Sequence, residues 1–119
     1  MQGLMQDYPL TLTNIFNRME QLYPDHTIVT GGPKPSRFTY GESCERIRRL
    51  ATALDTKLGL GPEAVVGSFC WNHVQHLELY YAVPCTGRVL HTLNIRLFPQ
   101  QIEYIANHAA DEVLSLIHI

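Results

Sequence analysis

A nearly continuous apolar run at Ala64–Cys70 constrains the fold of this chain more than any other segment. A run of this length without polar alternation is typical of a strand whose two faces are both buried. Val89–Leu93 has the same character and is expected to be a second buried strand. Glu112–Leu114 begins a third. The pattern therefore predicts a sheet in the interior of an α/β fold.

Helices are expected between these strands. The first extends from about His73 to Tyr81 or Cys85, with Pro84 near its end, and the second begins at Pro99, a residue that suits a first helical turn. The apolar positions of the second helix are Ile102, Ile105, Ala106 and Ala109, with His108 in its last turn. Strands that alternate with helices through short connections predict a parallel sheet with right-handed crossovers.

The N-terminal half has the pattern of a helix, a hairpin and a longer helix. Apolar residues recur at helical spacing over 12–22, behind Thr11 and Thr13, either of which can cap the start, and Pro24 ends the helix. Residues 27–38 then have the pattern of two short strands around a turn rich in glycine and proline.

The clearest helix begins with a capping box at Thr39 and Glu42, in which each side chain satisfies a backbone amide that the helix start leaves unpaired. Gly59 is placed to end this helix in a left-handed conformation. One apolar stripe runs along it: Tyr40, Cys44, Ile47, Leu50, Ala51, Leu54 and Leu58.

Three parallel strands make a poor sheet by themselves, because both outer strands would have open edges with apolar faces. The chain has 119 residues, of which 45% are hydrophobic and 17% charged, so it is globular and has a core. These features predict the opening part of a larger doubly wound domain.

The formal net charge of -2 argues against nucleic acid or an anionic membrane as a partner. A basic cluster at Arg46, Arg48 and Arg49 has Glu42 and Glu45 within helical reach, which favours a solvated, salt-bridged helix face. No membrane span or signal peptide is expected. Three cysteines without a Cys-x-x-Cys spacing favour a reducing compartment, and hence a cytoplasmic protein.

Several small catalytic or metal sites are conceivable, but each has a more ordinary interpretation. His73 and His76 are three residues apart, with Cys70 and His91 as further imaginable metal ligands, yet such a helical pair is more often polar surface or a hydrogen-bonding pair. Ser68 has no Gly-x-Ser-x-Gly elbow around it, and Cys70 ends a buried strand, where cysteine usually behaves as a small hydrophobe.

Two loops follow the carboxyl ends of predicted parallel strands, the edge at which open parallel sheets bind ligands. They are Trp71–His73 and Thr92–Asn94. Asn72 and His73 are therefore expected to line a cleft. The favoured interpretation of Asn72, however, is that it caps the helix that follows it.

Much of the chain, roughly from Tyr8 to Leu114, resembles the N-terminal region of AMP-forming acyl-CoA synthetases, closest to those that activate medium- and long-chain fatty acids. The resemblance is densest from Asn72 to Pro84, then at Gly87, Val89–Thr92, Asn94 and Arg96–Leu97. It implies the opening part of the large N-terminal domain of an adenylate-forming enzyme, an α/β fold with a partial parallel sheet and flanking helices.

The resemblance also implies a two-step ligase reaction in the full-length protein. A fatty acid or another carboxylic acid attacks the α-phosphate of ATP with Mg²⁺, and coenzyme A then displaces AMP from the acyl-adenylate. The family motifs for this chemistry are a Ser/Thr/Gly-rich loop with a lysine, an aromatic-Thr-Glu motif, a ribose-binding aspartate and a C-terminal lysine. None of them occurs in this sequence, so no residue is assigned a catalytic, cofactor-binding or metal role, and the chain alone is expected to be inactive. A homodimer is expected of the full-length enzyme.

Two features depart from the family pattern. Arg88 stands where the family usually has a small residue entering a buried strand, which is costly unless the guanidinium reaches solvent. The ending at 115–119 does not continue the expected apolar strand, so residues 1–114 are assigned to a partial AMP-binding domain and 115–119 to a non-native tail. The alternatives to a ligase fragment are a small stand-alone α/β binding module and, ranked last, a metal- or thiol-dependent enzyme built on Cys70, His73 and His76.

Overall fold

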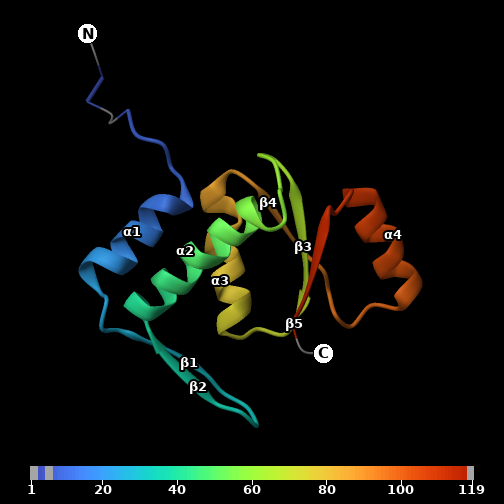
Figure 1. The fold of residues 1–119 in the computed structure, drawn as a ribbon, viewed down its shortest axis with the longest axis horizontal. Helices are drawn as coiled ribbons and strands as arrows, with labels where there is room; N and C mark the ends of the chain where they lie inside the picture. The colour runs from blue at the N-terminus through green and yellow to red at the C-terminus, as the bar shows by residue number, and fades with distance from the viewer. Residues whose placement is uncertain (1–2, 5–6, 118–119) are drawn as a thin grey trace.

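A computed structural model describes residues 3–4 and 7–117 of the chain, apart from the side chain of Ile117. A parallel sheet in the order β4-β3-β5 separates three helices from a fourth (Figure 1). The strands are β3 (Val65–Cys70), β4 (Val89–Thr92) and β5 (Val113–Ile117). Helices α1 (Leu12–Leu22), α2 (Tyr40–Thr56) and α3 (Val74–Ala82) lie on one side, and α4 (Pro99–Ala109) lies on the other. The predicted α/β fold with a partial parallel sheet and flanking helices is confirmed.

The N-terminal half also follows the prediction. The hairpin consists of β1 (Thr27–Thr30) and β2 (Ser36–Thr39) and leads directly into α2. The Thr39 hydroxyl accepts from the Glu42 amide at 3.1 Å while the Thr39 amide donates to the Glu42 carboxylate at 2.7 Å, which confirms the capping box. Gly59 has a φ of 63°, as its place after the helix requires.

Two apolar clusters form the core, both on the α1–α3 side of the sheet. The first joins the sheet to α2 and α3 and contains Leu54, Leu60, Ala64, Val66, Leu79 and Val83. The second lies among the three helices and contains Phe16, Met19, Cys44, Ile47 and Ala82. Leu58, predicted to belong to the α2 stripe, is instead 52% exposed because α2 ends at Thr56. None of the helices within the described ranges is long and apolar enough to cross a membrane.

The prediction that β4 is a buried strand is wrong. The strand order places β3 in the centre, so β4 is an edge strand and Val89 is 50% exposed. After α3 the chain passes through a short 3₁₀ turn, η1 (Pro84–Thr86), and Gly87 at a φ of 77° redirects it into this edge.

The basic cluster on α2 is a solvated, salt-bridged face as predicted, with side chains 39% to 75% exposed, but most of its acidic partners lie on other helices. Only Arg49 pairs within its own helix, with Glu45. Arg48 pairs with Glu20 on α1, and the hydrogen bonds from Arg48 hold the pKa of that carboxyl below its usual value. Arg46 donates to Glu78 on α3 at 2.5 Å, and Glu78 is only 5% exposed. Two of the three arginines therefore fasten neighbouring helices to α2.

Arg88 is buried, and its guanidinium does not reach solvent. Its Nη2 donates to the Leu60 carbonyl at 2.5 Å and to the Asp55 carboxylate, while Nε and Nη1 have no partner among the described residues. The free-energy cost of burying this charge is therefore only partly offset, by the Leu60 carbonyl and by an Asp55 carboxylate that is itself 59% exposed.

A substitution pair tests this account of Arg88. Arg88→Met keeps volume and removes the unpaired donors, so it is expected to cost less than about 1.5 kcal/mol or to stabilise the fold. Asp55→Asn leaves a buried cation without its counter-ion and is expected to cost about 1–3 kcal/mol. Urea unfolding of both variants measures the difference, and a larger loss for Arg88→Met would contradict it.

Gly67 allows a polar contact to cross the central strand. His91 on β4 and Asp111, just before β5, lie on opposite sides of β3 and meet with 2.8 Å between His91 Nδ1 and the carboxylate. A Cβ at Gly67 would lie 2.7 Å from Asp111 Oδ2 and 3.0 Å from Leu114 Cδ1. A side chain at position 67 would therefore displace either the His91–Asp111 pair or strand β5, which contains Leu114.

Gly67→Ala is accordingly expected to lower the free energy of unfolding by about 1–3 kcal/mol, as overpacking does in tight interiors. Gly31→Ala is the matched control, because an added Cβ there meets nothing within 4 Å. Chemical denaturation of both variants provides the comparison, and equal stabilities would show that the His91–Asp111 contact is easily displaced.

Candidate functional site: a hollow at the carboxyl ends of β3 and β4

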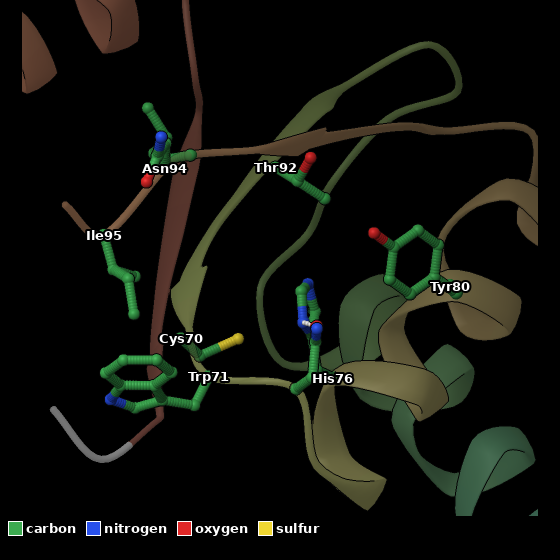
Figure 2. Close-up of a pocket in the computed structure, with 9 residues that line it drawn as sticks. Cys70, Trp71, His76, Tyr80, Thr92, Asn94 and Ile95 are labelled. Carbon is green, nitrogen blue, oxygen red and sulfur yellow. Dashed lines mark hydrogen bonds between the residues drawn. The ribbon is translucent and has the colours of Figure 1, made fainter. Parts of the chain in front are cut away.

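A hollow of about 330 Å³ lies where β3 and β4 end. In Figure 2, Trp71 and Ile95 lie on one side of the view and His76 and Tyr80 on the other, with Cys70 between Trp71 and His76 and Thr92 above His76. Because both strands run in the same direction, the loops that leave them meet at this edge. The lining residues are Cys70, Trp71, Asn72, His76, Tyr80, Thr92, Leu93, Asn94 and Ile95.

His76 is the most constrained side chain of the site. It is 7% exposed, its Nε2 lies 3.2 Å from the Ser68 hydroxyl, and its Nδ1 lies 3.3 Å from the Asn72 amide oxygen. That oxygen can only accept, so Nδ1 carries the proton and Nε2 accepts from Ser68. Burial lowers the pKa of His76, and neighbouring His73 acts in the same direction. The ring is therefore neutral near pH 7.

The structure assigns the helix cap to His73, so the favoured interpretation of Asn72 as the cap is wrong. His73 is the N-cap of α3, and its Nδ1 accepts from the His76 amide at 3.2 Å. Asn72 lines the main hollow and orients the His76 ring instead. His73 lines only a smaller hollow of about 200 Å³ beside it. Contact of either residue with a ligand stays a prediction.

Sequence reasoning placed both strand-end loops at this edge but did not place Tyr80, Ile95 or the His76 ring in the site. His76 and Tyr80 come from α3, and their rings lie 5.0 Å apart, one helical turn from each other. The (i, i+4) spacing is the signal that was available for Tyr80. Arg96 lies beside the hollow, with its guanidinium carbon 5.9 Å from the centroid of the Trp71 ring.

The arrangement does not support a nucleophilic enzyme. The polarity from Ser68 through His76 to Asn72 matches a catalytic triad, but Ser68 is 1% exposed and does not line the hollow. Cys70 does line it, yet burial raises the pKa of this thiol, so it is protonated near pH 7. Within the described ranges, histidine, cysteine and acidic side chains do not gather in groups of three that would hold a metal ion.

Comparison with protein families matches residues 16–116 to the family described as AMP-binding enzyme. The chain belongs to this family. It is 42% identical over 117 residues to a 3-methylmercaptopropionyl-CoA ligase of Ruegeria lacuscaerulensis, a match that covers 96% of this chain and 21% of that protein. It is 43% identical over 114 residues to the long-chain-fatty-acid–CoA ligase of Thermus thermophilus, covering 92% and 20%.

The fold is shared with solved members. A putative long-chain-fatty-acid CoA ligase from Rhodopseudomonas palustris superposes with a TM-score of 0.79 at 28% identity, over 92% of this chain and 27% of that one. The resemblance to AMP-forming acyl-CoA synthetases is therefore confirmed. The chain spans about a fifth of the length of the curated relatives that it matches.

The lowered pKa of His76 predicts how the stability of the folded chain depends on pH. Below its ordinary value of 6.5 the unfolded chain binds a proton at this residue that the folded chain resists, so stability falls as the pH falls. Between about pH 7 and pH 5, His76→Gln is expected to lose less stability than the parent chain does. Urea midpoints across this window measure the slope. Asn107→Gln, exposed on α4, removes no titratable group, so it is the control and should keep the parent slope.

Proposed function

We propose that the chain is the opening segment of an AMP-forming acid–CoA ligase that activates a carboxylic acid through acyl-AMP to acyl-CoA. The observation that carries the proposal is identity above 40% to two CoA ligases over nearly the whole chain. The reaction requires ATP, Mg²⁺ and coenzyme A in the full-length enzyme. Its substrate is a fatty acid or a related carboxylic acid, and its location is the cytoplasm.

In this proposal the 119 residues are scaffold and do not carry out the chemistry. Adenylation needs positive charge and backbone donors around the phosphates of ATP. The hollow at the strand ends is lined by nine residues. None of them is lysine, arginine or acidic, which favours a structural role over a catalytic one.

In the same proposal, residues 1–114 form a partial AMP-binding domain, 115–119 are a non-native tail, and the full-length enzyme is a homodimer. β5 extends to Ile117, so most of that tail pairs with β3 in this structure.

The first test is to sequence the source DNA or transcript across codon 114 and beyond. The expected result is a frame that continues past an apolar strand ending in aspartate to a lysine-bearing Ser/Thr/Gly-rich loop. A genuine stop after codon 119 would overturn the ligase assignment for this product and favour the stand-alone binding module.

The second test is an activity measurement on the 119-residue chain itself. We expect no fatty-acid-dependent exchange of pyrophosphate into ATP, because the family motifs that hold the phosphates are absent from these residues. The product of the extended frame is the positive arm of the same assay. Exchange by the short chain above the background of a no-acid control would contradict the scaffold assignment.

A further inference from the structure

The first turn of α3 is capped by two separate segments of the chain. A helix leaves the amide groups of its first turn without partners inside the helix. In α3 the His76 amide donates to His73 Nδ1 at 3.2 Å, which is a local cap. The Val74 amide donates instead to the Thr30 hydroxyl of β1, 44 residues earlier in the chain, at 3.2 Å. Val74 is buried, so this amide depends on the hairpin for its acceptor.

The hairpin has a second connection to α3, which passes through α2. The guanidinium carbon of Arg46 lies 4.8 Å from the centroid of the Phe38 ring on β2. The same guanidinium donates to the buried carboxylate of Glu78 at 2.5 and 3.1 Å. Val74 and Glu78 are four residues apart and therefore lie on one face of α3. The hairpin thus holds that face at two successive turns.

A different face of α3 forms a wall of the hollow at the strand ends. His76 and Tyr80 both line the hollow, and their rings lie 5.0 Å apart. At 3.6 residues per turn, His76 points about 200° away from Val74 around the helix axis. Because the helix is one hydrogen-bonded unit, the face held by the hairpin determines where the face that lines the hollow lies.

The hairpin itself is only lightly held. Figure 1 shows it projecting beyond the helices, and an added Cβ at Gly31 or Gly32 in its turn meets nothing within 4 Å among the described residues. Its base is joined to the start of α2, where the Tyr40 amide donates to the His26 carbonyl at 2.7 Å. A two-stranded hairpin is marginally stable by itself in water, so it can open while the sheet stays folded.

We propose that the β1–β2 hairpin is a strap that controls the shape of the hollow. Closed onto α3, it fixes the first helical turn and with it the contact between Asn72 and His76; released, it loosens both. Thr30 and Phe38 are the positioning residues of this device. The coupling goes beyond the proposed ligase function, because it is a conformational property of these residues that requires no turnover. Its failure would leave the ligase assignment intact, and an active ligase would not establish it.

The first test is native-state hydrogen exchange of the ¹⁵N-labelled 119-residue chain at low urea concentrations. The Val74 and His76 amides are expected to exchange through the same local opening as the amides of the β1–β2 ladder, and more readily than those of β3. Exchange of Val74 and His76 only together with β3, while the hairpin amides exchange earlier, would show that the hairpin opens without releasing α3 and would overturn the proposal.

The second test uses a matched pair of substitutions in β1. Thr30→Val removes the acceptor of the Val74 amide and keeps the shape of the side chain. It is expected to speed exchange of the Val74 and His76 amides by about tenfold and to shift the signals of the Asn72 side-chain NH₂ and the His76 ring. Thr27→Val is the control, because the Thr27 hydroxyl accepts from Arg37 within the hairpin, at 3.2 Å.

Phe38→Leu removes the aromatic ring from Arg46 and tests the second connection. It is expected to shift the same Asn72 and His76 signals while the β3 amides keep their exchange rates. Unchanged signals of Asn72 and His76 in both Thr30→Val and Phe38→Leu, or an equal response in Thr27→Val, would contradict control of the hollow by the hairpin.

Discussion

The pairing of β3 with a strand on each side determines where almost everything else in this chain lies. Because successive side chains of a strand face opposite ways, β3 contributes to two layers. Val66 packs against α2 and α3, whereas Phe69 lies against α4. All three strands run in the same direction, so their carboxyl ends share one edge and the loops after β3 and β4 enclose a single hollow there.

Polar contacts on both faces of β3 specify its register. On one face the buried hydroxyl of Ser68 reaches His76 of α3, and on the other the His91–Asp111 contact crosses above Gly67. A slip by one residue would turn Ser68 toward α4 and place a side chain where the carboxylate of Asp111 lies. Apolar residues alone would tolerate such a slip more readily, because Val and Phe can exchange faces at a smaller cost.

The sequence predicted the elements well and their mutual placement less well. Periodicity and capping chemistry are local, so α2 with its Thr39–Glu42 box could be predicted from the sequence. The central position of β3 could not be predicted from the sequence, because a central strand and an edge strand can both contain the same apolar run. The partners of Arg46 and Arg48 lie on other helices, and only tertiary packing brings them near. Tyr80 was missed for the same reason: α3 must pack against the sheet before its ring can reach the hollow.

The two faces of the sheet are covered by helices to different extents. The hollow depends on the face that is better covered. Toward α2 and α3 the sheet is covered by one apolar cluster, and a second cluster fills the space among the helices behind it. Toward α4 a groove of about 540 Å³ remains between the helix and the sheet, and Leu116 is 63% exposed. This asymmetry is expected of a segment that spans about a fifth of its relatives. His76 and Tyr80 come from α3, on the well-packed side, so the orientation of Asn72 depends on the part of the fold that these residues complete by themselves.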